Sequence, residues 1–448
     1  MTVPVGVAHP LSRRAVAALL LGVLAAGAAA VLWLWTAQAE PVRGWAGWLT
    51  AGGRILGLLG AYLLLVEVFL MARVPWLDHR LGSDWISSLH RALGEYLICL
   101  LLGHAVLITA GYALTDHRNV AAESAHIVLT YQDVLRAAVA LGLLCVIGVA
   151  SARAVRRRLR YPTWHGIHLY AYLALFLAYG HQTAVGADFT TDRAAATVWK
   201  LLHVAVGLCV VAFRFGGPVR RAVRHRLHVT HVVPEAEGVV SVYVSGTRME
   251  ELRAAPGQYF RWRFLTRDRW WQAHPFSVSG TVWKDGRCWL RITVKALGDD
   301  TAGLQRLRPG TRVLVEGPYG AFTPALRRGG KVLLFAGGVG ITPLRAMFDV
   351  VPPDTVLLYR ASRPGDLALS RELDAYASAG RLTVHYLLGH RRTRPDPLDP
   401  RRLRRLVPDI ADRDVFLCGP PGMVSVARRA LRATGVRPSR IHTENFAY

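Results

Sequence analysis

The sequence predicts a multi-domain membrane protein in which a six-helix transmembrane bundle precedes an antiparallel β-barrel and an α/β domain with a parallel sheet. Three patterns lead to this fold class. Long apolar windows fill the first half of the 448-residue chain. Apolar and polar residues then alternate with period two, and strand-like runs finally alternate with helix-like runs. The domain boundaries that follow are 1–216 for the bundle, 222–325 for the barrel and 326–448 for the α/β domain.

Six apolar windows of about 18–25 residues are each long enough to cross a hydrocarbon core of about 30 Å. They lie near 15–35, 46–71, 89–112, 134–152, 164–181 and 196–213. The first window follows Arg13 and Arg14, as the apolar part of a signal peptide would. Its length and the spans that follow it favour a retained helix instead.

The arginines orient the predicted spans, because basic residues accumulate in cytoplasmic loops. One side of the membrane receives Arg13 and Arg14, the cluster SARAVRRRLR at 151–160 and the arginines that follow the sixth span. The opposite loops carry few basic residues and several acids. We therefore expect a multi-pass protein of the cell membrane with both termini in the cytoplasm.

Composition bears on two further classes of function. A net charge of +25 suits a nucleic-acid partner, but membrane topology explains the arginine clusters better, and no nucleic-acid partner is expected. The five cysteines are scattered and show no CxxC spacing. The sequence therefore supports neither a disulfide framework nor an iron–sulfur cluster.

Two of the predicted spans carry a histidine near each end. His90 and His104 lie in the third span, and His168 and His181 lie in the fifth. Both spans run from the cytoplasm outward, so the members of each pair are separated by about 20 Å along the membrane normal. Imidazole is a common axial ligand of haem iron, and the two pairs predict two stacked bis-histidine haems of the b type. A packed interior histidine is the alternative for each residue taken alone.

Helical geometry fits one pair better than the other. The spacing of fourteen residues between His90 and His104 falls about 40° short of four full turns, so these two residues share a face. The spacing of thirteen leaves His168 and His181 about 140° apart on an ideal helix. We therefore expect the fifth helix to be bent, rewound or rotated against its partner, with Gly180 as a suitable place.

Three other polar residues lie within the spans. His165 competes with His168 as the inner ligand, whereas His203 is expected to pack or to contact a haem propionate. Arg54 lies about two turns below the outer end of the second span, where a cation is costly. It is expected either to neutralise a haem propionate or to contribute to the site of the outer acceptor.

The second half of the chain begins with alternating runs separated by turn residues. The runs are LHVTHVV, VVSVYVSG, QYFRWRFL, CWLRITVKAL and TRVLVEG. This period-two pattern predicts strands of a small antiparallel barrel. HPFSVSG, at 274–280, lies within the same region.

A glycine-rich turn opens the predicted α/β domain. FAGGVGITP places Gly337, Gly338 and Gly340 where a buried strand turns into a helix, which allows the backbone to approach a pyrophosphate. CGPPGM, from Cys418 to Met423, ends a second strand at the carboxyl edge of the predicted sheet. A glycine-rich turn alone is weak support, but the two motifs together predict a dinucleotide site at that edge.

The motifs together resemble a known family. Residues 225–448 resemble the ferredoxin–NADP reductase superfamily, and the whole chain resembles the ferric reductase and NADPH oxidase family. The motifs that carry the resemblance are the two histidine pairs, HPFS, EGPYG, GGVGITP, CGPPGM and the carboxyl-terminal ENF.

The resemblance implies bound FAD and NAD(P)H, with residues assigned motif by motif. FAD would be contacted by His274, Pro275, Phe276 and Ser277 at the isoalloxazine and ribityl chain, and by Lys295 and Thr301 at the pyrophosphate. NAD(P)H would be held at its phosphates by Gly338, Gly340, Thr342 and Pro343, and bordered at its nicotinamide by Cys418 and Gly419. Phe446 would cover the flavin, with Tyr448 as the alternative because the chain continues past ENF. Cys418 and Phe446 are thus the candidate catalytic residues.

The segment YRASRPGD bears on the choice of coenzyme. No acidic residue follows the strand to hold a ribose 2′-hydroxyl, whereas Arg360, Ser362 and Arg363 could bind a 2′-phosphate. This pattern favours NADPH over NADH, with solvated surface arginines as the alternative.

The implied activity is electron transfer from NAD(P)H through FAD and the two haems to a small-molecule acceptor outside, either a ferric chelate or oxygen. In the oxidases, an arginine like Arg54 acts with a histidine one turn beyond the outer ligand, but that position here is Ile108. Two alternatives remain. The chain could be an electron-transfer subunit for quinone or a periplasmic partner, or a cofactor-binding membrane scaffold without sustained turnover.

Overall fold

The computed structural model describes residues 13–37, 42–159, 161–268, 270–389 and 396–445. It divides into two compact units, Met1–Gly216 and Gly217–Tyr448. The predicted boundary within the second unit, near residue 325, stays a prediction.

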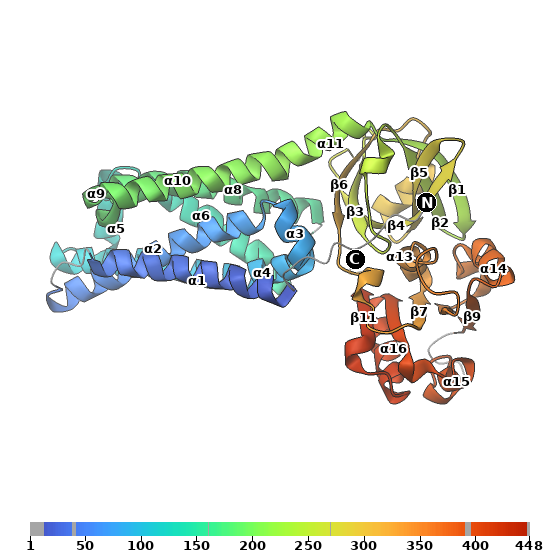
Figure 1. Cartoon of the computed structure of the whole chain (residues 1–448). Helices are drawn as coiled ribbons and strands as arrows, with labels where there is room; N and C mark the ends of the chain where they lie inside the picture. The colour runs from blue at the N-terminus through green and yellow to red at the C-terminus, as the bar shows by residue number, and fades with distance from the viewer. Residues whose placement is uncertain (1–12, 38–41, 160, 269, 390–395, 446–448) are drawn as a thin grey trace. The chain divides into compact units, whose positions relative to one another are not determined.

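The first unit is a bundle of helices (Figure 1). Its long members are α1 (Arg13–Ala37), α2 (Gly44–Leu70), α4 (Ser83–Thr115), α6 (Val134–Ser151), α8 (Tyr161–Ala184) and α10 (Arg193–Cys209). Shorter helices lie between them, namely α3 (Pro75–Leu81), α5 (Val120–Thr130), α7 (Arg153–Arg156) and α9 (Ala187–Thr191), and the π-helical segment η1 (Val210–Gly216) follows α10.

Within the described residues, five helices are long and apolar enough to cross a membrane. They are Ala15–Ala37, Gly44–Leu70, Trp85–Thr115, Val134–Ser151 and Arg193–His225. The predicted fifth span corresponds to α8. This helix is long enough to cross a membrane, but its mean hydropathy is lower than that of the other five. Its three histidines and four tyrosines lower its apolar character, so the structure confirms a membrane protein but not the count of six spans.

Helix α2 packs closely against α4 because glycines line the contact. A Cβ atom on Gly57 would lie 2.5 Å from His104 Nδ1, and one on Gly60 would lie 2.6 Å from Leu101 Cδ2. Gly53 and Gly57 also have the four-residue spacing that lets membrane helices approach each other. The imidazole of His104 therefore rests directly on the backbone of α2.

The second unit begins with α11 (Gly217–His225) and a six-stranded antiparallel sheet. Its strands are β1 (His228–Ala236), β2 (Val239–Ser245), β3 (Tyr259–Phe264), β4 (His274–Lys284), β5 (Arg287–Lys295) and β6 (Val313–Tyr319), in the order β1-β2-β5-β4-β3-β6. The predicted antiparallel sheet is confirmed, and HPFSVSG opens β4. Closure into a barrel stays a prediction, although an isolated bridge joins His228 of β1 to Arg312 just before β6.

A five-stranded parallel sheet completes the second unit, as the alternating pattern predicts. Its strands are β7 (Val332–Gly337), β8 (Val356–Ala361), β9 (Thr383–Leu388), β10 (Asp414–Gly419) and β11 (Ile441–Asn445), in the order β11-β10-β7-β8-β9. The helices of this part are α13 (Ile341–Arg345), α14 (Ser370–Ser378), α15 (Pro400–Leu406) and α16 (Pro421–Ala433), while α12 (Asp299–Gly303) follows β5. Strand β11 was not predicted.

The strand order places a topological switch between β7 and β10. The chain moves from β7 outward to β8 and β9, and then returns to the other side of β7 as β10. Ligands of open α/β sheets bind at the carboxyl ends of strands beside such a switch. Both glycine motifs lie there, one after β7 and the other at the end of β10.

Candidate functional site

His104 on α4 and His181 on α8 form one pair of facing rings. Their ring centres are 6.5 Å apart. Nδ1 of His104 lies 2.8 Å from the carbonyl oxygen of Gly53, and Nδ1 of His181 lies 2.7 Å from that of Ala178. A carbonyl oxygen only accepts, so Nδ1 donates in both rings and Nε2 keeps its lone pair for a metal.

His90 and His168 form the second pair on the same two helices. Their ring centres are 5.8 Å apart. Nδ1 of His90 contacts the carboxylate of Glu67, a residue of α2 that is only 5% exposed. The ring of His168 also stacks on Trp164, with centres 5.0 Å apart. The structure thus brings His168 to His90. The ring of His165 lies near Trp164, with centres 6.4 Å apart.

The spacing of both pairs fits an iron atom between the rings. Metal–imidazole bonds of about 2 Å place the two ligating nitrogens about 4 Å apart. A five-membered ring with bonds of about 1.33 Å has its centre about 1.1 Å from each atom. The ring centres of a bis-histidine site should therefore lie about 6.2 Å apart, and the observed 6.5 Å and 5.8 Å bracket this value.

Helix α8 is one continuous α-helix from Tyr161 to Ala184, so a bend or a rotation against its partner remains the expected way to bring His168 and His181 to the same neighbouring helix. Two residues about 140° apart around a helix can both reach one neighbouring helix. This happens when the direction toward the neighbour lies midway between them, about 70° from each residue. Gly180 has a different effect. A Cβ atom there would lie 2.9 Å from Oδ2 of Asp133, so this glycine makes room for that carboxylate beside His181.

Arg54 is paired with a carboxylate of its own chain. Its Nη2 lies 2.7 Å from Oδ1 of Asp188, whose side chain is only 5% exposed. His203 packs between aromatic rings, with its centre 4.8 Å from that of Tyr179 and 5.0 Å from that of Trp199. The charge of Arg54 is therefore compensated without a propionate.

The predicted flavin residues lie along β4 and the end of β5. The rings of His274 and Phe276 are stacked with centres 5.7 Å apart. Ser277 is 3% exposed, and within the described residues its hydroxyl has no hydrogen-bond partner. An orphaned buried hydroxyl fits a site that a polar ligand completes. Lys295 ends β5, and the hydroxyl of Thr301 accepts a hydrogen bond of 2.8 Å from Leu297 N.

The glycine motifs after β7 and β10 meet at the switch point. A Cβ atom on Gly419 would lie 3.2 Å from the carbonyl oxygen of Gly337, and one on Gly340 would meet the backbone of Cys418. Gly338 has a φ of +54° and open space beside it, which is the form of a turn that a phosphate can approach. Thr342 is buried, and its hydroxyl donates to the carbonyl oxygen of Val339 over 2.5 Å. Pro343 is buried in the short helix α13.

Cys418 lies at the end of β10 and is fully buried. Burial, reinforced by the charge of Glu444, raises the pKa of its thiol well above the usual value. Cys418 is therefore a neutral thiol at the switch point and not a reactive thiolate. Phe446 and Tyr448, the predicted cover of the flavin, lie outside the described residues.

The three residues assigned to coenzyme choice have different surroundings. Nη1 of Arg360 donates to the carbonyl oxygens of Ala361 and Leu387 over 2.6 and 3.2 Å, and burial lowers its pKa. Arg363 is exposed and lies 3.4 Å from Asp366 and 3.5 Å from Glu237. Ser362 is exposed beside it. Arg363 and Ser362 are thus accessible to a phosphate, whereas Arg360 is already engaged by backbone carbonyls.

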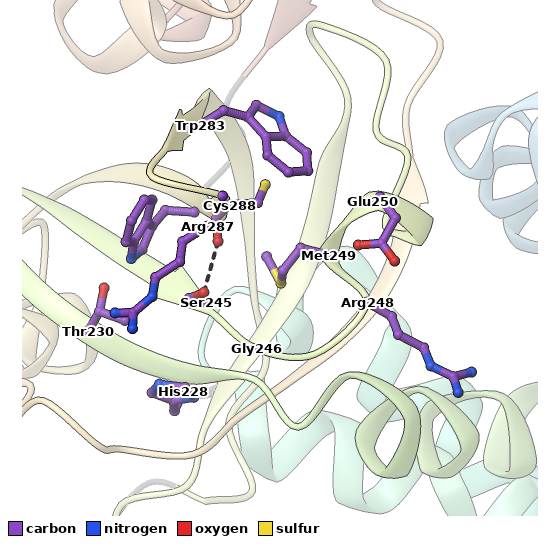
Figure 2. Close-up of a pocket in the computed structure, with 12 residues that line it drawn as sticks. His228, Thr230, Ser245, Gly246, Arg248, Met249, Glu250, Trp283, Arg287 and Cys288 are labelled. Atoms are coloured by element: carbon purple, nitrogen blue, oxygen red, sulfur yellow. Dashed lines mark hydrogen bonds between the residues drawn. The ribbon is translucent and has the colours of Figure 1, made fainter.

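A pocket of about 410 Å³ lies in the antiparallel sheet and contains none of these predicted residues (Figure 2). It lies between Trp283, Met249 and Cys288, among others. Burial raises the pKa of the Cys288 thiol to about 11. The Cys288 thiol is therefore neutral at ordinary pH, and none of the predicted cofactor residues lines this pocket.

Sequence reasoning missed Glu67 and Asp188. Both are buried carboxylates that contact a singled-out residue, His90 in one case and Arg54 in the other. An acid within an apolar span is costly and tends to be functional, so Glu67 could have been noticed in the second span. Asp188 lies outside the predicted spans and carried no comparable signal.

Three family models match consecutive parts of the chain. The model described as "Ferric reductase like transmembrane component" matches residues 56–179, and the "FAD-binding domain" model matches residues 226–323. The "Oxidoreductase NAD-binding domain" model matches residues 334–429. The first match contains His90, His104 and His168 and ends two residues before His181.

Curated proteins are similar to part of the chain. The glycine betaine monooxygenase reductase subunit of Chromohalobacter salexigens is 30% identical over 171 residues, which make up 35% of this chain and 46% of that protein. An NADPH oxidoreductase of Mycobacterium tuberculosis is 30% identical over 202 residues, which make up 43% of this chain and 52% of that protein. The chain thus spans about half the length of each relative.

Among solved structures, the FAD/NAD-binding domain of nitric oxide dioxygenase from Vibrio cholerae has a TM-score of 0.41 at 23% identity. The match covers 49% of this chain and 98% of that one. A ferredoxin reductase of carbazole 1,9a-dioxygenase has a TM-score of 0.41 at 20% identity, covering 50% of this chain and 69% of that one.

Proposed function

We propose that this protein, which joins a ferric-reductase-like transmembrane component to an FAD-binding domain and an NAD-binding domain, is a transmembrane oxidoreductase. It carries electrons from cytoplasmic NAD(P)H through FAD and two b-type haems to an acceptor on the outer face. The supporting observation is the pair of facing histidines at each of two levels on α4 and α8. Two such pairs provide two metal positions along one route through a membrane bundle.

The cofactors supply the redox chemistry, with FAD converting the two-electron hydride of NAD(P)H into single electrons for haem iron. The chain supplies position and environment. Backbone carbonyls of Gly53 and Ala178 fix the tautomer of the outer ligands, and Glu67 orients the inner ligand His90. The buried hydroxyl of Ser277 and the open turn at Gly338 are the groups best placed to receive FAD and NAD(P)H.

The surroundings of Arg54 favour a ferric chelate over oxygen as the acceptor. An oxygen site of the oxidase type uses an arginine together with a histidine one turn beyond the outer ligand, and Ile108 occupies that second position. Arg54 is also neutralised by Asp188 at 2.7 Å. A cation that is already paired has less charge to offer a developing superoxide anion.

The test uses the purified full-length protein loaded with FAD and haem. NADPH or NADH is added without oxygen, and haem reduction is followed by absorbance, after which ferric citrate, oxygen and a quinone are supplied separately. We expect NADPH to reduce the haems and ferric citrate to reoxidise them with sustained NADPH consumption. Haems that NAD(P)H does not reduce would contradict the electron route, whereas reoxidation by oxygen or quinone alone would contradict only the acceptor.

A further inference from the structure

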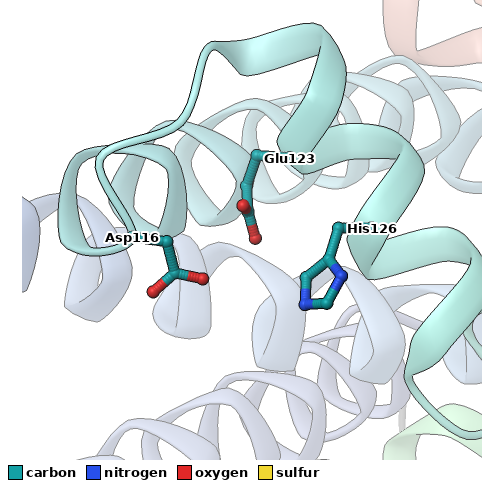
Figure 3. Close-up of side chains that lie close together, drawn as sticks. All are labelled: Asp116, Glu123 and His126. Carbon is teal, nitrogen blue, oxygen red and sulfur yellow. The ribbon is translucent and has the colours of Figure 1, made fainter.

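A cluster of possible metal ligands lies just beyond the end of α4 that carries His104. Asp116 follows α4 directly, and Glu123 and His126 lie one turn apart on α5. Figure 3 shows the three side chains directed toward one another. One ligand atom from each residue lies within 4.8 Å of the others.

Glu123 is the unusual member of the cluster, because its side chain is fully buried. Within the described part of the chain, neither of its carboxylate oxygens has a hydrogen-bond partner. Arg118 forms an ion pair with it at 3.6 Å, but the arginine side chain is 44% exposed. A buried carboxylate without hydrogen bonds is costly, so this oxygen pair is left available to a further ligand.

His126 is oriented by a contact outside the cluster. Its Nδ1 lies 3.2 Å from the hydroxyl oxygen of Thr130, four residues further along α5. When Nδ1 donates to that oxygen, Nε2 keeps its lone pair, which is the arrangement of metal-ligating histidines. Asp116 is exposed and is therefore free to rotate toward its neighbours.

We propose that Asp116, Glu123 and His126 bind a divalent first-row transition-metal ion. Two carboxylates and an imidazole suit such ions better than Ca²⁺ or Mg²⁺, which prefer oxygen-only shells. Bonds of about 2.0–2.2 Å hold any two ligand atoms within about 4.4 Å of each other. The three ligand atoms all lie within 4.8 Å of one another, and the exposed side chain of Asp116 has room to adjust to these bond lengths. The site stands independently of the proposed electron route.

The test is equilibrium dialysis of the chelator-treated, tag-free full-length protein against micromolar Zn²⁺ and, separately, Mn²⁺, with metal analysis corrected for haem iron. We expect one bound ion per chain, with affinity at least about tenfold weaker in Asp116→Asn and His126→Ala. These two side chains are not fully buried, so their replacement should leave the fold intact. Unchanged haem content and gel-filtration behaviour check this.

Arg118→Ala distinguishes the metal site from a simple ion pair. Removing the competing cation should preserve or strengthen metal binding, because Glu123 then has no ion-pair partner in the part of the chain that the structure describes. An excess of 1 mM Mg²⁺ should not displace Zn²⁺. The proposal is overturned if the unaltered protein binds no more Zn²⁺ or Mn²⁺ than His126→Ala, or if Mg²⁺ competes equally.

Discussion

Glu67 places a carboxylate inside an apolar helix, against the ring of His90. A carboxylate that accepts from Nδ1 fixes the ring and strengthens Nε2 as a donor to iron, which stabilises the ferric state. Glu67→Gln should therefore raise the midpoint potential of the inner haem and weaken its retention by about 10–100-fold. Redox titration followed by absorbance measures the first effect, and haem content after dialysis measures the second.

Glu95→Gln is the matched control, since Glu95 lies on the exposed side of α4 five residues after His90. The outer haem should keep its potential in both variants. Equal potentials in the Glu67→Gln and Glu95→Gln proteins would show that Glu67 does not act on the inner ligand.

A second prediction concerns Gly57 of α2. Its missing side chain leaves room for the imidazole of His104, because a Cβ atom would lie 2.5 Å from Nδ1. Gly57→Ala should displace this ring and break its hydrogen bond to Gly53, so that the outer haem is lost while the inner haem stays. Gly142→Ala on α6, where a Cβ atom meets nothing within 4 Å, should keep both haems. Haem absorbance per chain decides the comparison, and a full complement in Gly57→Ala would refute the packing argument.

Among the secondary-structure elements, the amino ends of the parallel strands β7, β8 and β10 are connected by hydrogen bonds from Arg413. Its side chain is 7% exposed and donates to the carbonyl oxygens of Val332 and Asp354 over 2.9 and 2.8 Å. Asp409 accepts two further hydrogen bonds from it, over 2.8 and 3.0 Å. These bonds lie at the end of the sheet opposite to the glycine motifs, so they should affect stability and not coenzyme binding.

Hydrogen bonds from Arg413 lower the pKa of Asp409 from 3.8 to about 2. Because this pKa is depressed in the folded state, the stabilisation is complete above about pH 4 and is lost as the pH falls toward 2. Asp409→Asn should lower the free energy of unfolding by about 1–2 kcal/mol at pH 7, with a difference from the unaltered protein that shrinks at acidic pH. Chemical denaturation at several pH values measures it.

The control for this prediction is Asp412→Asn, since Asp412 is exposed and its carboxylate receives no hydrogen bond from the described residues. Neither substitution should change the KM for NADPH. A pH-independent loss of stability in Asp409→Asn would show that the ionised carboxylate is not what matters.

The elements show where sequence reasoning succeeds and where it ends. Period-two alternation identified five strands of the antiparallel sheet, most clearly β3, where the buried side chains of Phe260 and Trp262 alternate with less buried neighbours. β11 was missed because its five residues, IHTEN, show too little apolar character. The linkage of Arg291 on β5 to Glu372 on α14 at 2.7 Å was equally out of reach, since contacts between distant charges leave no local pattern.

The candidate site shows the same limit, because local patterns predict residues along one element but not their partners on other elements. Spacing and local pattern located the histidines and the glycines, because these depend on periodicity along one helix or on local backbone geometry, whereas HPFS was identified by the family resemblance. Which ring faces which depends on how each helix is rotated about its axis, and the spacing of residues along one helix does not give that rotation. The partners Glu67 and Asp188 come from other helices, and only the tertiary structure brings them to His90 and Arg54.

For the whole molecule, the proposed orientation makes electron flow directional, and variants of single ligands test this direction. The inner pair, His90 and His168, is expected on the cytoplasmic side, nearer to the source of electrons, and the outer pair nearer to the acceptor. The unaltered protein should hold two low-spin b-type haems. Removing one ligand of either pair should leave one haem, and the two kinds of variant should then behave differently with NADPH.

His104→Ala should keep a haem that NADPH reduces at nearly the normal rate, while ferric citrate reduction falls by at least about tenfold because the final step is lost. His90→Ala should keep a haem that dithionite reduces but NADPH reduces only slowly, since the intervening centre is missing. Stopped-flow absorbance with each reductant separates the two variants, and dithionite serves as the control for intact haem in both. If NADPH reduced the remaining haem of His90→Ala rapidly and that of His104→Ala slowly, the assignment of inner and outer pairs would be reversed, and with it the direction inferred from the arginine clusters.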